Sequence, residues 1–484
     1  MPGALTWLLV SALFWGPYVF PWPLAWAIVA FDAYWFFRSF SSAYHSIQGY
    51  WRIKAAKATD WRAEYEKALD DGKVLLPWEE VHHIILIPSY KEKVEKLRVT
   101  LEHIAAQSIA AQQITVVLAL EEREDHAEAR MHVLLDEFRD SFANIFITVH
   151  PTDLPGEVAG KSANEAWAAR RAKERIIDEL GYDIENVTVS SCDADSCFHP
   201  NYFECLTYKF ATDPNRHLRF WQAPILLYNN IWDVPMPVRL VSTLSSISFL
   251  GDLCKKHGLV FPQSTYSLSL KMAHDVDYWD ADVIPEDWHM FLKCFFHLEG
   301  KVTTEPIFLP IGSDAVCSTT YWRSLVSRYN QAKRHAWGAE DIPYALKECF
   351  LHNEISLWSR FRRTWALVEN HMLWSTHWFV LALGGAIPAR LAPQLREMLP
   401  FAGLPEVAGL LLTASLGPFL VIIILDSILR PPAPKSKFWL APVTHLQWFL
   451  LPVTSALFAT LPAVHAQTQM MMQKPMAYEV TEKV

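Results

Sequence analysis

Two aspartates lie two residues apart in the middle of the chain, directly after a short apolar run. They are Asp193 and Asp195, in the segment Ser191–Ser196. In an extended backbone the side chains at positions i and i+2 point to the same side, so both carboxylates can face one cation. Mg²⁺ and Mn²⁺ take oxygen ligands and share their coordination with substrate phosphates. The pair therefore predicts a Mg²⁺ or Mn²⁺ site that binds a diphosphate, and the alternative is a solvated acidic turn.

A second acidic pair, Glu286 and Asp287, lies between Pro285 and Trp288. Proline and acids are typical of the first turn of a helix, where the dipole favours negative charge. At the start of a helix that faces a cleft, Asp287 can take a proton from an acceptor hydroxyl, as a general base does. The alternative is an ordinary helix start followed by a buried aromatic face.

A third pattern lies in Arg328–Gly338, where Gln331 and Arg334 are three residues apart and share one helical face. Arg334 suits a diphosphate and Trp337 suits the wall of an acceptor site. A basic surface helix is the alternative.

Polar residues also follow the first two apolar runs of strand length. Pro88, Tyr90 and Glu92 lie at the end of the first run, and Glu121 and Glu122 follow the second. These positions suit a nucleoside base and ribose, and Lys161 suits a phosphate. The glycine and serine on either side of Lys161 lack the upstream glycine spacing of a P-loop, which excludes a P-loop NTPase.

The elements that must position these residues alternate between strands and helices. The predicted strands are Val81–Pro88, Gln113–Leu120, Asn144–His150 and Asn186–Asp195, and the predicted helices are Glu92–Gln107, Glu124–Phe138 and Ser162–Leu180. This alternation predicts an α/β domain with a mostly parallel sheet and helices on both faces. Ligands of such sheets gather at the carboxyl ends of the strands.

The two ends of the chain are apolar, and the middle is polar. The formal net charge of −9 argues against a nucleic-acid partner, which would require a basic stripe. Residues 5–40 are almost uncharged and exceed the roughly 20 residues that one span needs. Arg52, Lys54, Lys57 and Arg62 follow, and positive residues are typical of the cytoplasmic side.

The sequence therefore predicts an integral membrane protein, in the plasma membrane, whose central domain is cytosolic. Its predicted parts are an N-terminal membrane segment at 1–40, with two spans or a re-entrant pair, a cytosolic linker at 41–80, the α/β domain at 81–350, an interfacial amphipathic helix at 351–372, membrane segments at 373–466 and a tail at 467–484.

Taken in order, the motifs resemble those of glycosyltransferase family 2, in its membrane-bound branch of cellulose-synthase-like and ceramide-glucosyltransferase-like enzymes. The resemblance covers residues 81 to about 350. Gln331 and Arg334 resemble the family's Q-x-x-R-W signature, although His335 follows the arginine here and the tryptophan comes at Trp337. The other matches are Pro88, Tyr90 and Glu92, the Gly-Lys region at Lys161, the metal triplet Asp193–Asp195 and the pair Glu286–Asp287.

The resemblance implies a GT-A fold and an inverting single displacement. It implies a divalent metal on Asp193 and Asp195, and Asp287 as the base, beside Glu286. The residues it implies for the donor are Pro88, Tyr90, Glu92, Glu121, Lys161, Asp193, Gln331 and Arg334, and those for the acceptor are Trp288 and Trp337.

The expected reaction moves a sugar from a UDP- or GDP-sugar to a lipid or lipid-linked acceptor, with membrane lipids and glycans as partners. One alternative is a processive polysaccharide synthase, which would share these residues and would need a channel. The other is a non-catalytic membrane scaffold with the same fold.

Overall fold

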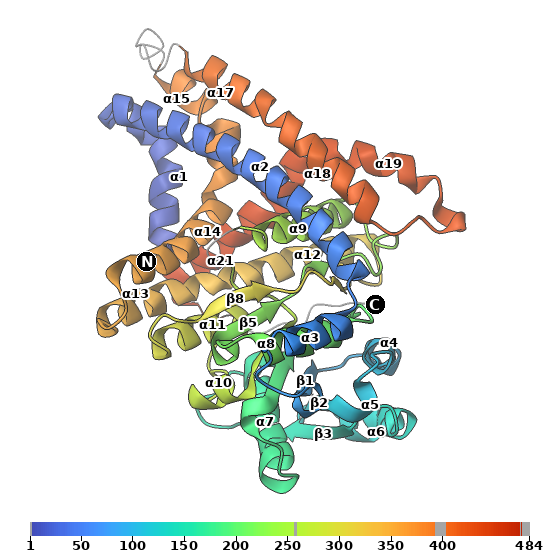
Figure 1. The fold of residues 1–484 in the computed structure, drawn as a ribbon. Helices are drawn as coiled ribbons and strands as arrows, with labels where there is room; N and C mark the ends of the chain where they lie inside the picture. Colours follow the sequence, from blue (N-terminus) through green and yellow to red (C-terminus); the bar gives the residue numbers. More distant parts are fainter. Residues whose placement is uncertain (1, 256–258, 393–402, 475, 477–484) are drawn as a thin grey trace.

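The computed structural model describes residues 2–255, 259–392, 403–474 and 476. An α/β body with one large sheet occupies one end of the molecule, and helices from both ends of the chain gather at the other (Figure 1). The fold is of the α/β class predicted from the alternating pattern.

The sheet has seven strands in the order β3-β2-β1-β4-β7-β5-β8. All neighbouring pairs are parallel except those of β7, which is antiparallel to both β4 and β5. The prediction of a mostly parallel sheet is therefore confirmed. The strands are β1 His82–Ser89, β2 Ile114–Glu121, β3 Asn144–His150, β4 Val187–Ser191, β5 Arg219–Gln222, β7 Tyr266–Ser269 and β8 Thr303–Pro306, and a separate parallel pair is formed by β6 Ile225–Leu226 and β9 Ile311–Gly312.

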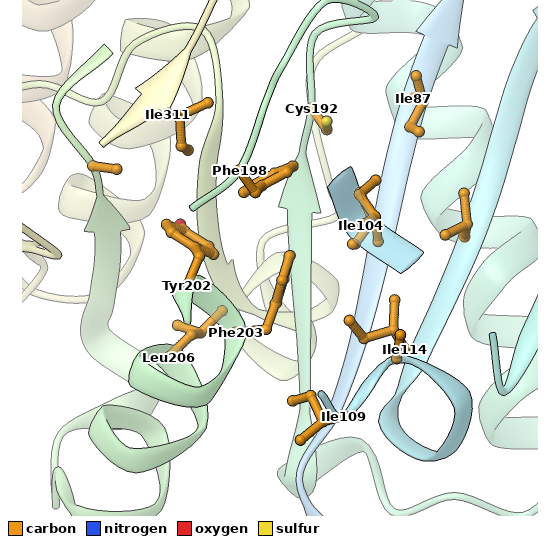
Figure 2. Close-up of a cluster of buried hydrophobic side chains, with 14 of the residues drawn as sticks. Ile87, Ile104, Ile109, Ile114, Cys192, Phe198, Tyr202, Phe203, Leu206 and Ile311 are labelled. Carbon is orange, nitrogen blue, oxygen red and sulfur yellow. The ribbon is translucent and has the colours of Figure 1, made fainter. Parts of the chain in front are cut away.

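Helices cover both faces of the sheet, which explains why its strands are apolar runs rather than alternating patterns. One face packs against α4 Val94–Ala105, α6 Ala127–Phe138 and α8 Tyr202–Thr212. Figure 2 shows this core, where Phe198, Tyr202 and Phe203 lie beside isoleucines of the neighbouring strands and loops. Each such side chain stabilises the fold by about 1.5–3 kcal/mol on burial.

The other face packs against α7 Lys161–Lys173, α10 Leu270–Asp275, α11 Glu286–His297 and α13 Asp341–Leu351.

The fourth predicted strand, Asn186–Asp195, is longer than the strand in the structure. β4 ends at Ser191, and the Ser196 N–H donates to the Asp193 carbonyl at 3.0 Å, so the two aspartates lie in a turn.

The helices from the two ends of the chain pack on one another. Helix α1 contacts α14, α15 and α21, whereas α2 runs along α9, α17 and α18 (Figure 1). Their bounds are α1 Pro2–Val19, α2 Pro21–Ala58, α9 Met236–Asp252, α14 Leu357–Leu383, α15 Ala386–Leu391, α17 Leu404–Ala414, α18 Leu416–Leu429, α19 Leu440–Leu446, α20 Leu451–Ser455 and α21 Leu461–Met471. The remaining α-helices of the described chain are α3 Trp61–Asp70, α5 Ala110–Gln113 and α12 Tyr321–Ala336.

Four of the predicted boundaries fall inside helices. Helix α2 continues through residue 40, α13 through residue 350, α14 through residue 372 and α21 through residue 466. Of the predicted tail, residues 467–471 belong to α21, while residues 475 and 477–484 lie outside the described residues.

Two helical stretches of the described chain, Glu406–Leu429 and Pro442–Met471, are long and apolar enough to cross a membrane. Both begin within the predicted C-terminal membrane segments. Within residues 2–40 no described helix meets the same measure, although many apolar side chains of α1 and α2 are exposed, among them Leu8, Phe14 and Phe37.

Candidate active site

A cavity of about 590 Å³ opens at the carboxyl ends of the parallel strands. Its lining comes from loops after β1, β2 and β4 and from helices α2, α9, α12 and α14. The cavity brings together the predicted site residues Pro88, Tyr90, Glu92, Glu121, Lys161, Asp193, Asp195, Glu286, Asp287, Trp288, Gln331 and Arg334.

Lys161 lies at the centre of the acidic part of this cavity. It is the first residue of α7, and its Nζ is 2.8 Å from Glu286 Oε1 and 3.0 Å from Asp193 Oδ1. Glu165 and Asp287 lie further away, at 3.6 Å and 3.9 Å. Burial opposes the charge on Lys161, but the surrounding carboxylates, Asp193 foremost, raise its pKa well above the usual value. The lysine is therefore a fixed cation that holds these acids together.

Asp287 lies in the first turn of α11, as the Pro-Glu-Asp pattern predicts. The Ser264 N–H donates to Asp287 Oδ2 at 2.8 Å, while the buried Oδ1 accepts no hydrogen bond from the described residues. Burial and the neighbouring Glu286 raise the pKa of Asp287 well above its usual range. A carboxylate with a raised pKa is a stronger proton acceptor, which is the property of a general base.

An ionic cluster fixes the helix that carries Asp287. His289 lies between Asp341 Oδ1, at 2.7 Å, and Asp280 Oδ2, at 2.9 Å. Burial acts to lower the pKa of His289, but its hydrogen bonds with Asp280 and Asp341 raise it to about 9. The protonated imidazole therefore joins α11 to α13 and to the preceding loop.

Ser264 connects Asp193, of the predicted metal pair, to Asp287, the predicted base, and was not singled out in the sequence. Its hydroxyl donates to Asp193 Oδ2, and its N–H donates to Asp287. Its φ of 61° is in the left-handed region, which non-glycine residues adopt at an energetic cost. Because β7 is antiparallel, its first residue, Tyr266, lies at the edge where the parallel strands end, and Ser264 just before it reaches the cavity.

Asp193 and Asp195 line the same cavity but have different partners. Asp195 Oδ2 accepts from Ser313 Oγ at 2.8 Å and from the Asp314 N–H at 2.6 Å, whereas Asp193 pairs with Lys161. No group of three or more His, Cys, Asp or Glu side chains forms a metal cage in the described part of the chain. Two carboxylates at one cavity fit a divalent cation that draws its other ligands from a diphosphate.

Of the predicted nucleoside residues, Tyr90 and Glu121 both contact the side chain of Arg123. The guanidinium carbon of Arg123 lies 4.1 Å from the centre of the Tyr90 ring, and Arg123 also pairs with Glu121. Glu122 points elsewhere and accepts from the Thr152 N–H at 2.9 Å. Arg123 was missed, although it stands directly after the two acids that the sequence suggested.

Helix α12 brings Gln331 and Arg334 to the cavity but not Trp337. Gln331 accepts a hydrogen bond from Arg328 Nη1 at 2.9 Å. The Trp337 indole N–H donates to Glu340 Oε2 at 2.7 Å, and its ring packs in a cluster with alanines of α21. Trp337 therefore lies outside the cavity lining.

Trp288 does line the cavity, next to Asp287. Its ring stacks on Phe261, with centres 4.6 Å apart, and meets the His371 ring edge-on at 5.4 Å. From there the lining continues along α2, α9 and α14.

Comparison with known proteins identifies the family of the chain. The profile of glycosyl transferase family group 2 matches residues 189–464, which is more than half of the 484-residue chain. The match runs from β4, before the metal pair, into α21. No curated protein matches the chain.

Solved structures show distant similarity. A mannosyltransferase from Pyrobaculum calidifontis, in complex with GDP-Man and Mn²⁺, is 14% identical with a TM-score of 0.47, over 84% of this chain and 98% of that one. TarS residues 1–349 of S. aureus are 10% identical with a TM-score of 0.36, over 81% and 92% of the two chains. The family assignment rests on the sequence profile, which covers the metal pair, the Glu-Asp pair and the Gln331–Arg334 helix. The chain therefore belongs to glycosyl transferase family group 2 and is a glycosyltransferase.

Proposed function

We propose that the protein is a metal-dependent, inverting glycosyltransferase that uses a UDP- or GDP-sugar and glycosylates a lipid or lipid-linked acceptor at the membrane, with Asp287 as the general base. The observation that carries the proposal is the environment of Asp287. Its Oδ1 is buried and accepts no hydrogen bond from described residues, its pKa is raised, and it shares Lys161 with Asp193.

In this reaction the acceptor hydroxyl gives its proton to Asp287 while its oxygen forms a bond to the anomeric carbon. The bond between that carbon and the diphosphate oxygen breaks, and the nucleoside diphosphate leaves with the electron pair. Attack from the face opposite the leaving group inverts the configuration. Lys161 and Arg334 line the cavity where the diphosphate charge grows, and fixed cations stabilise such charge.

A divalent metal on Asp193 and Asp195 would neutralise part of the same charge. Different groups hold the two carboxylates in place. Asp195 is held by Ser313 and the backbone of residue 314, and Asp193 by Ser264 and Lys161. Tyr90, Arg123 and Glu121 would bind the nucleoside.

The membrane part of the proposal rests on exposed apolar surface. At the start of α14, Trp358, Phe361 and Trp365 are at least half exposed and their rings stack in a row. Helix α18 exposes Leu420 and Ile424. Exposed aromatic stripes and apolar helices are typical of membrane interfaces and spans. We place the protein in the plasma membrane, with residues 81–350 as the cytosolic catalytic domain.

One observation favours a processive synthase as the second candidate. The cavity continues beyond the acids between α2, α9 and α14, which are long helices of the membrane-side layer. A chain of sugars could extend along this path. The length of the product distinguishes the candidates, because single transfer gives one added sugar and processive synthesis gives a long polymer.

The test is a donor screen with purified protein in detergent. UDP- and GDP-sugars are supplied with and without Mn²⁺ or Mg²⁺ and with membrane lipids, and the released nucleotide is measured. We expect metal-dependent turnover of one donor, lost in Asp195→Ala. Absence of turnover and of binding for every donor would favour the scaffold alternative.

A further inference from the structure

The part of the cavity beyond the catalytic acids has a different chemical character. Its lining includes three serines of α9, Ser242, Ser245 and Ser248, and Asn370, His371 and Trp374 of α14. These side chains offer hydroxyl, amide, imidazole and indole groups. Such a surface suits a ligand with many hydroxyls better than an alkyl chain, because each ligand hydroxyl needs hydrogen-bond partners when it leaves water.

His371 is the residue of this surface whose environment points most directly to a ligand. Only 2% of it is exposed, it lines the cavity, and neither ring nitrogen has a hydrogen-bond partner among the described residues. Leaving a buried polar atom unpaired costs about 1–3 kcal/mol. Such atoms are rare in folded proteins, so a pair of them beside a cavity points to a ligand that satisfies them.

The protonation state of His371 narrows the type of ligand. Burial lowers its pKa to about 4, so the ring is neutral at physiological pH. A neutral imidazole has one N–H donor and one nitrogen acceptor. A sugar hydroxyl both donates and accepts, so hydroxyls of a carbohydrate can bind either nitrogen.

The surroundings of His371 include the residue that follows Asp287 in α11. Trp288, which directly follows Asp287, meets the imidazole edge-on at 5.4 Å, and the Trp374 ring centre is 6.3 Å away. Gly338 lies against the same ring, and a Cβ there would be 3.2 Å from His371 Cε1 and 3.4 Å from Nε2. A side chain at position 338 would therefore press on the imidazole, and the glycine leaves room for the ring.

We propose that His371, with Trp288 and Trp374, binds a sugar ring of the acceptor, so that the hydroxyl activated by Asp287 belongs to a carbohydrate. The indole rings supply apolar surface and an N–H to the faces and edges of the sugar, and His371 binds its hydroxyls. This rests on the proposed function and makes it more specific: the acceptor is a glycan or a glycolipid with a terminal sugar, rather than a bare lipid alcohol.

The test compares wild type with His371→Ala and His371→Gln, where glutamine keeps one donor group and one acceptor atom. Initial rates are measured against glucose, mannose, N-acetylglucosamine and their β-linked disaccharides, and against dioleoylglycerol in phosphatidylcholine vesicles. Hydrolysis of the donor without any acceptor reports on the donor half of the cavity.

We expect transfer to at least one saccharide, a rise of tenfold or more in its KM for His371→Ala, a rise below threefold for His371→Gln, and donor hydrolysis within twofold of wild type in both. Transfer to dioleoylglycerol alone would overturn the inference and leave the proposed function standing. An equal loss of donor hydrolysis, or an unchanged saccharide KM, would also overturn it.

A binding measurement covers the case in which no turnover is seen. Saturation-transfer NMR of the same saccharides with the wild-type protein and UDP or GDP should show contact, and His371→Ala should weaken it. Saccharide contact that is identical in both proteins, or missing in wild type, would contradict the inference. Loss of nucleotide binding would instead count against the proposed function.

Discussion

The two halves of the cavity differ in how their polar groups are satisfied. In the catalytic half, Lys161 lies among four carboxylates, and Ser264 joins two of them. In the half between α2, α9 and α14, most lining side chains are uncharged, and neither ring nitrogen of His371 has a hydrogen-bond partner among the described residues. The charged groups of the first half suit a nucleoside diphosphate. The neutral polar groups of the second half suit ligand hydroxyls.

The halves also differ in where they come from in the chain. Strand ends and helix starts of the α/β body build the catalytic half, from residues that are close in the fold topology. Helices α2, α9 and α14, which are remote in sequence, build the other half. The predictions below test whether the two halves serve separate substrates.

The largest effect is expected for Lys161→Met. Removing one partner of a buried ionic group costs about 3–5 kcal/mol, because the remaining charges stay buried. The free energy of unfolding should fall by this amount, and donor turnover should be lost. Thermal denaturation and donor hydrolysis measure both. Lys161→Arg keeps the charge and should recover most of the stability, whereas an unchanged melting temperature for the methionine variant would refute the central role of Lys161.

The pH dependence of transfer should follow Asp287. Because its pKa is raised by burial and by Glu286, activity should fall as pH decreases through a value well above that of an ordinary aspartate. In Glu286→Gln the neighbouring charge is gone, so this acid limb should move down by about one pH unit. Profiles of kcat against pH measure the shift. If the acid limb of the profile lies at the same pH in both proteins, that limb does not report the ionisation of Asp287.

Ser264→Ala should weaken metal binding at Asp193 and leave the ionisation of Asp287 unchanged. The variant loses the hydroxyl bound to Asp193 and keeps the N–H bound to Asp287. Groups that orient metal ligands contribute about tenfold or more to metal affinity. The Mn²⁺ concentration for half-maximal activity should therefore rise about tenfold, with the acid limb unmoved. A shifted acid limb with an unchanged Mn²⁺ dependence would show that the Ser264 hydroxyl acts on the base and not on the metal ligand.

The smallest effect concerns stability at Glu165. Burial raises the pKa of Glu165 to about 8, so between its ordinary pKa and pH 8 the folded protein keeps a proton that the unfolded chain releases. Its contribution to stability is therefore full at acidic pH and is lost as pH rises towards 8. Glu165→Gln should raise the melting temperature at pH 8 more than at pH 5. A constant difference between the two pH values would argue against a protonated Glu165.

Local patterns predicted the strands and the helix start that line the acidic half of the cavity. The apolar runs at β1, β2 and β3 and the Pro-Glu-Asp start of α11 are set by neighbouring residues, and their observed bounds lie close to the predicted ones. The fourth strand was predicted to extend to Asp195, with a turn only as the alternative; in the fold Asp193–Ser196 is a turn, and the Asp314 N–H from a distant loop holds Asp195 there.

Residues that depend on tertiary contacts could not be predicted. Ser264 reaches the cavity only because β7 is antiparallel, and the short, polar sequence Tyr266–Ser269 gave no sign of a central strand. His371 is one histidine of a long helix until α14 places it against Trp288. Trp337 was assigned to the acceptor site from its resemblance to the Q-x-x-R-W signature, and its ring packs against α21 instead.

The most direct test of the central claim is to measure donor binding and transfer together in Asp287→Asn. The asparagine still accepts the Ser264 N–H, so the change removes the base and little else. We expect the Kd of UDP or GDP with Mn²⁺ to stay within threefold of wild type, while transfer falls by about 10²–10⁴-fold. Transfer near the wild-type rate would show that another group takes the proton, and a parallel loss of nucleotide binding would show that Asp287 is part of the donor site instead.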